Sequence, residues 1–278
     1  MRPGKLAATP AIHQSIGRPV LADLTIEHGP VTLLGRFFLL ADGLLAEAGV
    51  TLYRTTLAEA AAAQSANVDS WNMFPPMLDT RLSAIPDATS YGLLGRNERG
   101  DVVCAQGGRI YDLGDRSFAD IVADQSFFYG TEIPPAPGKP TAEVAAPSAP
   151  LVRGRMVYSG ALWVRPDYRG KNLSGVLPRF SRCYALAKWN TDFTVGMVSE
   201  SNIVPKLLAA YGYNRIEPRF TIHNLAPTSL SWALLLMRRD ELVEDLTGFV
   251  DSRSAQIDAA VGDGRAQDQA RLVADRNG

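Results

Sequence analysis

The chain has 278 residues, of which 46% are hydrophobic and 21% charged, and this composition suits a globular protein with a sizeable core. Its formal net charge of −1 argues against nucleic acid or an anionic membrane as a partner bound by bulk electrostatics. The two cysteines and three histidines are scattered and the N-terminus lacks a secretory apolar core, so we expect a cytoplasmic protein without disulfides or a metal site.

A helix is the first element that the sequence predicts. Apolar residues recur at spacings of three and four over residues 31–48, Pro30 suits the first turn, and Gly49 suits the end. The next expected elements are a strand at 50–54, an alanine-rich helix at 56–65, an irregular segment with exposed aromatics at 68–86, a hairpin of strands at 90–94 and 102–111, and a short helix at 117–128.

The second half of the chain begins with residues 133–150, whose Pro and Ala content predicts a surface loop. A polar tail or marginal helix is expected at the other end, over residues 252–278. Between them we expect a strand at 156–164, a tight turn at 168–174, a helix at 173–187 kinked by Pro178, a strand at 193–198, a helix at 201–210, strands at 213–217, 220–223 and 231–238, and a helix at 240–250.

This order of elements predicts an α/β fold with a mixed sheet and helices on its faces. We divide the chain into an N-terminal helical extension (1–48), one α/β domain (49–251) and a polar tail (252–278).

Basic residues are concentrated in one part of the chain. Residues 153–188 contain eight of them and a single acid, Asp167, although the whole chain is slightly acidic. The predicted turn before a helix would add unpaired backbone N–H groups and the positive end of the helix dipole, which together suit a phosphate group. A solvated basic helix face is the alternative; the turn favours an anion site. The eight are Arg153, Arg155, Arg165, Arg169, Lys171, Arg179, Arg182 and Lys188.

Two stretches resemble a known family. Residues 162–174, LWVRPDYRGKNLS, followed by an amphipathic helix, resemble the CoA-binding motif of the GNAT superfamily of N-acetyltransferases. Residues 199–213, SESNIVPKLLAAYGY, resemble its later motif, in which an Asn begins a helix that ends in Tyr-Gly-Phe or Tyr-Gly-Tyr. The order of elements over 50–238 fits as well, so the resemblance covers roughly two thirds of the chain and implies a mixed, mostly antiparallel central sheet.

The resemblance also implies roles for individual residues. Backbone N–H groups of the turn would hold the pyrophosphate of acetyl-CoA, and Leu162 and Val164 would offer main-chain groups to the pantetheine arm and the acyl carbonyl. Asn202 would hydrogen-bond the pantetheine, and Tyr211 would protonate the departing thiolate; a buried aromatic residue at a helix end is the structural alternative for Tyr211. The turn residues are Arg169, Gly170, Lys171, Asn172, Leu173 and Ser174.

The turn departs from the family pattern at two positions. Asn172 and Ser174 stand where the superfamily usually has glycine, which tolerates positive φ and lets phosphate approach the backbone. Asn is the next most tolerant residue for a left-handed conformation, and Ser is small and carries a hydroxyl donor. These substitutions leave open that the chain binds CoA weakly or uses a different acyl donor.

The general base is not evident from the sequence. Glu200 follows a predicted strand and is our candidate, although an exposed glutamate at a helix start is a common structural feature. Glu27, Asp69 and Asp79 are alternatives, whereas Cys104 and Cys183 are interpreted as core residues because no cationic motif activates them. Trp71, Met73, Phe74 and Tyr129 are interpreted as packing residues, with the wall of an acceptor pocket as the alternative.

The expected function is acyl transfer, in which acetyl-CoA donates its acyl group to a primary amine of a small molecule without any metal. The expected partners are thus a CoA thioester and a small amine, and the sequence leaves a homodimer open. Two rivals are a CoA-binding regulatory protein without catalysis and a related transferase that takes its acyl group from a carrier protein or aminoacyl-tRNA.

Overall fold

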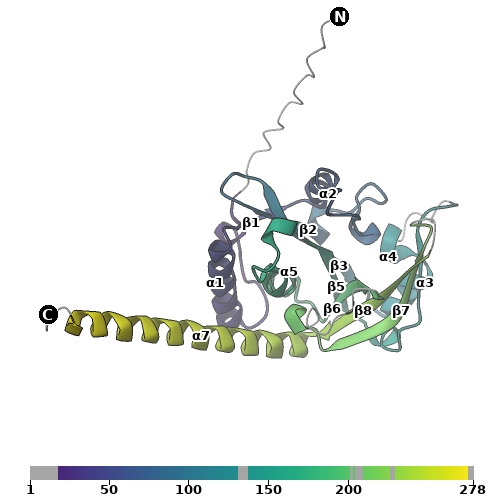
Figure 1. Ribbon diagram of the computed structural model, residues 1–278. Helices are drawn as coiled ribbons and strands as arrows, with labels where there is room; N and C mark the ends of the chain where they lie inside the picture. Colours follow the sequence, from purple (N-terminus) through teal and green to yellow (C-terminus); the bar gives the residue numbers. More distant parts are fainter. Residues whose placement is uncertain (1–17, 131–136, 201–202, 204–208, 226–228, 275–278) are drawn as a thin grey trace, which may run out of the picture.

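The computed structural model describes residues 18–130, 137–200, 203, 209–225 and 229–274. It contains an eight-stranded sheet in the order β1-β2-β3-β5-β6-β8-β7-β4 (Figure 1). The strands are β1 (Thr51–Thr55), β2 (Ser90–Arg96), β3 (Val102–Asp112), β4 (Thr141–Val144), β5 (Arg155–Val164), β6 (Phe193–Ser199), β7 (Arg215–His223) and β8 (Leu230–Arg238).

All neighbouring strands of this sheet pair antiparallel except β5 and β6, which are parallel. The predicted fold class, a mixed and mostly antiparallel sheet flanked by helices, is therefore confirmed. The helices are α1 (Val31–Glu47), α2 (Leu57–Ser65), α3 (Phe118–Ala123), α4 (Ser126–Tyr129), α5 (Leu173–Trp189) and α7 (Arg239–Ala274). Short 3-10 turns are η1 (Val20–Ala22), η2 (Pro76–Leu78), η3 (Asp87–Thr89), η4 (Ala149–Leu151) and η5 (Pro166–Tyr168).

The core has two parts, one on each face of the sheet. Helices α1, α5 and α7 contribute buried residues to the first part, and α2, α3 and α4 to the second. Helix α5 is buried on nearly all sides because α1 and α7 cover it from outside, with Phe38 of α1 packing edge-to-face on Phe180 at 5.1 Å. Phe37 likewise lies 6.0 Å from Phe249 of α7. The N-terminal helix is thus integral to the core.

Several local expectations differ from the structure. The segment expected as a loop contains β4, the edge strand of the sheet, which pairs with β7. The two short strands expected near 213–223 form one strand, β7, with an irregularity between Glu217 and Phe220 where Arg219 has a φ of 73°. In the segment 68–86 the aromatic residues Trp71 and Phe74 are buried.

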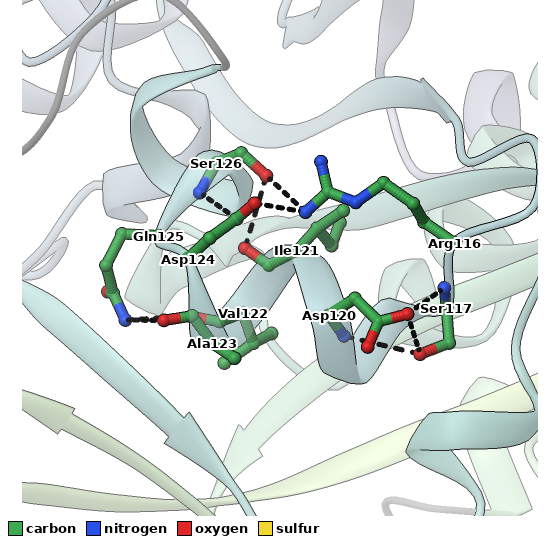
Figure 2. Close-up of polar contacts among 9 residues, drawn as sticks. All are labelled: Arg116, Ser117, Asp120, Ile121, Val122, Ala123, Asp124, Gln125 and Ser126. Carbon is green, nitrogen blue, oxygen red and sulfur yellow. Dashed lines mark hydrogen bonds and ion pairs between the residues drawn. The ribbon is translucent and has the colours of Figure 1, made fainter.

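The single helix expected over 117–128 is divided in two at Gln125, whose φ is 66°. Figure 2 shows how α3 begins with a capping box, in which Ser117 and Asp120 each accept the other's backbone N–H. At its end Arg116 pairs with Asp124, and the side chain of Gln125 bonds to the carbonyl of Val122 (2.8 Å) (Figure 2). These local bonds stabilise the break between α3 and α4.

Helix α7 continues without a break past residue 252, where the polar tail was expected to begin, and it projects from the body of the molecule (Figure 1). Within the described part of the chain, no helix is both long and apolar enough to cross a membrane.

Candidate active site

Strands β5 and β6 separate in the middle of the sheet. They pair only where Met156, Val157 and Tyr158 face Phe193, Thr194 and Val195. Beyond these residues β5 runs on to Val164 and β6 to Ser199 without further pairing between the two. The separation leaves a gap in which a molecule could bond to the main chain of β5.

A β-bulge in β5 lies beside this separation. Gly107 and Ala105 of β3 are two positions apart, whereas their partners Gly160 and Trp163 in β5 are three apart. The extra residue bends the strand, and Ala161 there adopts a φ of 58°, which costs energy for any residue with a Cβ atom. The bulge redirects the main chain of residues 162–164 relative to the paired half of β5.

A cavity of about 1150 Å³ occupies the gap. That volume exceeds the usual range for one small ligand, about 300–1,000 Å³. Its lining includes β5 from Tyr158 to Val164, the residues Tyr168, Arg169, Gly170, Asn172, Leu173 and Ser174 of the turn, β6 from Gly196 to Ser199, and Ala210, Tyr211 and Tyr213. The cavity thus joins the predicted phosphate turn to Tyr211 along β5.

The turn adopts positive φ values, although it has Asn172 at a position where glycine is usual. Gly170 has a φ of 82°, and Asn172, the residue before α5, is left-handed with a φ of 58° and a ψ of 15°. No backbone carbonyl of the described residues accepts a hydrogen bond from the N–H groups of residues 170–174. Asn172 therefore fills the role of glycine here, and the first turn of α5 offers unpaired donors to an anion.

Three of the eight basic residues of 153–188 form ion pairs with carboxylates of the described residues in the folded chain. Arg179 and Arg182 are buried against Asp245 of α7, and Arg165 pairs with Asp167 and Asp101. The charge that remains at the turn comes from two exposed residues. Arg169 donates to the carbonyl of Val164 at 3.3 Å, and the Nζ of Lys171 donates to the carbonyl of Ala48 at 3.2 Å.

A buried ion-pair network, formed by Arg179, Arg182 and Asp245, holds the chain segment that carries Tyr211. Arg182 is fully buried and donates from Nη2 to the main-chain oxygen of Tyr211 at 2.8 Å. Arg179 donates to the main-chain oxygen of Ala210 at 2.6 Å and makes two bonds to Asp245, at 2.9 and 2.8 Å. The sequence analysis did not find Asp245, because it lies 63 residues after Arg182.

Gly212 shows how closely the network approaches this segment. Its φ is 75°, and a Cβ atom there would lie 2.4 Å from Nη2 of Arg179 and 2.5 Å from Oδ1 of Asp245. Only glycine fits, which gives the Tyr-Gly pair of the sequence motif a physical reason.

Tyr211 itself is half-buried and lines the cavity. Burial raises the pKa of its phenol above the ordinary value of 10.0. The hydroxyl therefore keeps its proton at neutral pH, as a proton donor must.

The other predicted site residues are distributed as follows. Leu162 and Val164 lie on the separated half of β5 and line the cavity. Glu200 is exposed, and its Oε1 accepts the backbone N–H of Arg219 at 3.2 Å. The described residues that line the cavity do not include Glu200. They do not include the alternative bases Glu27, Asp69 and Asp79 either. Asn202 and most of its expected helix lie outside the described residues.

Cys104 and Cys183 are buried, and burial raises both thiol pKa values, that of Cys104 to about 12. They are core residues, as interpreted from the sequence. Among the described residues, no group of three His, Cys, Asp or Glu side chains is placed to hold a metal ion.

Part of the cavity lining is aromatic. Trp71 stacks on Trp163 with ring centroids 5.0 Å apart and an angle of 6° between the planes, and Trp232 of β8 also lines the cavity. Trp71 and Met73 thus line the cavity, whereas Phe74 and Tyr129 do not; the latter is buried and donates to the carbonyl of Pro140. Trp163 and Trp232 had no sequence signal beyond their size.

Comparison with known proteins gives low similarity. No family model matches the chain, and no curated protein matches it significantly. Solved structures that match include the spermidine/spermine N-acetyltransferase SpeG from Vibrio cholerae, with 10% identity and a TM-score of 0.41 over 70% of this chain and 97% of that one.

Two further matches were solved with acetyl-CoA. YncA from Salmonella typhimurium, described as a putative acetyltransferase, has 14% identity and a TM-score of 0.37, covering 68% of this chain and 94% of that one. NAA60 from Arabidopsis thaliana has 10% identity and a TM-score of 0.43, covering 68% and 99%. Likeness at this level carries no argument, so the function is argued from the geometry of this chain.

Proposed function

We propose that the chain is an acyl-CoA-dependent N-acyltransferase of GNAT type that transfers an acetyl group to the primary amine of a small molecule. One observation carries the proposal. A single cavity connects the N–H groups of residues 170–174, which no described backbone carbonyl accepts, with the half-buried Tyr211, along the part of β5 that does not pair with β6. A long, flexible phosphate ester with a thioester at its far end fits this arrangement.

In the proposed complex the pyrophosphate lies against the N-terminus of α5, where backbone donors and the helix dipole favour negative charge. Arg169 and Lys171 flank that position. The pantetheine arm then follows β5 past Val164 and Leu162, whose main-chain groups would bond its amides. The thioester reaches the region of Tyr211, and Asn202 remains a proposed pantetheine ligand on the basis of the sequence motif alone.

The reaction needs a neutral amine, whose nitrogen lone pair attacks the thioester carbonyl carbon. The carbonyl oxygen becomes negatively charged, and backbone N–H groups beside the bulge would stabilise it. When the carbon–sulfur bond breaks, the sulfur takes the electron pair and the proton of Tyr211. The new amide nitrogen loses its extra proton to solvent, from which the phenolate regains one. Glu200 stays a candidate base only through solvent, because its carboxylate is exposed.

The first test is binding and turnover measured on the same preparation. Acetyl-CoA should bind in calorimetry, and addition of a primary amine should release free CoA thiol at a rate that saturates with both substrates. Binding without thiol release for any amine would favour the rival in which the protein is a CoA sensor, a reading supported by the absence of carboxylates and histidines among the described lining residues. Failure of free CoA to compete with a carrier-bound donor would favour the carrier-dependent rival.

A further inference from the structure

The acyl donor, as proposed, occupies only one part of the cavity. The remaining part is lined by residues of the segment that leads into η2, of η2 itself, of β5 and of β7 and β8. We call this part the acceptor chamber and define it by Trp71, Met73, Met77, Trp163, Ile222 and Trp232. In the proposed complex, the amine that attacks the thioester sits there.

The residues that define the chamber carry no charge. Among the described residues that line the whole cavity, the only charged side chain is Arg169, in the turn. A polyamine or an amino acid carries several charges, and burying each one without a partner is costly. The chamber therefore disfavours polycationic and zwitterionic acceptors.

The walls also select for shape. Trp71 and Trp163 are each 4% exposed and stack face to face, so they form a closed flat wall and not a cage of open aromatic faces around a cation. Flat apolar groups gain from packing against such a wall, through burial and through ring–ring contacts.

The same lack of charge bears on the missing base. The charged form of an amine loses its hydration in an apolar chamber, so its pKa falls and the neutral form is favoured. Because direct attack requires the neutral form, the chamber itself would favour the reactive amine, a task for which no carboxylate stands among the described lining residues.

From these observations we infer that the acceptor is an arylalkylamine, a primary amine joined by a short chain to an aromatic ring. This inference rests on the proposed function, since it names the second substrate of the same cavity.

Turnover of matched amines tests the inference. With acetyl-CoA as donor, kcat/KM for 2-phenylethylamine should exceed that for spermidine or lysine by at least about 100-fold, the order expected for burying one unpaired charge. Higher kcat/KM for spermidine or lysine would overturn the inference while leaving the proposed function intact. Thiol release with none of these amines would overturn the proposed function instead.

Two substitutions test whether the acceptor chamber determines the KM for 2-phenylethylamine. Trp71→Leu should raise KM for 2-phenylethylamine about tenfold with KM for acetyl-CoA unchanged, since it removes one ring of the stacked wall. The matched control is Trp189→Leu, because Trp189 lies at the end of α5 near Tyr91 and does not line the cavity. Equal effects of both substitutions on KM would overturn the inference.

Asn72→Asp adds a carboxylate of the same shape at an exposed position of the lining. It should raise kcat/KM for spermidine relative to 2-phenylethylamine about threefold, as expected for an exposed charge pair. Calorimetric binding of both amines to the CoA-saturated protein, with melting temperatures as a folding check, gives a readout independent of catalysis. Tighter binding of spermidine than of 2-phenylethylamine to the unmodified protein would overturn the inference.

Discussion

The phenol of Tyr211 lies in the cavity wall, and the main-chain oxygen of the same residue is held by a buried arginine. Tyr211→Phe removes one oxygen atom and leaves the ring and backbone in place. Turnover should fall about 100-fold, as expected for the loss of a general acid, with acetyl-CoA affinity nearly unchanged. Tyr168→Phe is the control, because Tyr168 also lines the cavity but at the turn. Equal kcat values for both variants would contradict the role of Tyr211.

The pH dependence follows from the raised pKa of Tyr211. An acid must be protonated to act, and a pKa above the ordinary value keeps the phenol almost fully protonated up to about pH 9. Between about pH 7 and 9, kcat should therefore show little decline due to this group. A decline centred below about pH 9, with circular dichroism unchanged, would show that another group is the acid.

Ala161 stores strain at the bulge of β5. Replacing it by glycine relieves the positive φ but adds flexibility to the unfolded chain, so the free energy of unfolding should change by no more than about 1 kcal/mol. Ala161→Val places a β-branched side chain in the same conformation and should destabilise the protein by about 2 kcal/mol or more. Urea unfolding measures both; equal effects would show that the left-handed conformation is not retained.

At the scale of elements, the buried ion-pair network joins α5 and α7 to the segment of Tyr211. Asp245→Asn leaves two buried guanidinium groups without a full counter-charge and should lower the free energy of unfolding by about 3 kcal/mol. Asp240→Asn on the same helix is the control, because Asp240 pairs with Arg238 at an exposed site. That change should cost about 0.5 kcal/mol or less. Similar losses for both variants would contradict a structural role of the network.

Periodic and alternating patterns predicted most elements of the fold. Helix α1, the β2–β3 hairpin and strands β5 and β6 have the expected positions, because their apolar residues face the core at regular spacings. Strand β4 escaped prediction because Pro and Ala dominate its surroundings and its stability comes from pairing with β7. The interruption of β7 at Pro218 and Arg219 suggested two strands where tertiary pairing maintains one.

The site was predictable where it depends on local sequence. The left-handed conformation of Asn172 and the position of Tyr211 next to Gly212 follow from residue type and spacing. The sequence did not predict how many basic residues near the turn form ion pairs, because Asp101 and Asp245 approach them only in the folded chain. The separation of β5 from β6 and the stacking of Trp71 on Trp163 are likewise properties of the fold alone.

For the molecule as a whole, the N-terminal helix is expected to stabilise the entire domain. Phe38 is 2% exposed and packs on Phe180, so Phe38→Ala should lower the free energy of unfolding by about 3–5 kcal/mol. Leu39→Ala is the matched control because Leu39 is 73% exposed, and its effect should be within about 0.5 kcal/mol. A single cooperative thermal transition in both variants is expected; separate transitions would mean that α1 folds apart from the domain.

Because Arg179 and Arg182 share the carboxylate of Asp245, a change at one of these three positions affects the other two. An apolar residue in place of Asp245 would strand two positive charges in the interior, and the loss of either arginine alone would free Tyr211 or Ala210 from its anchor. Natural relatives should therefore exchange these three positions together, and a lineage that has abandoned one of them should have replaced the other two.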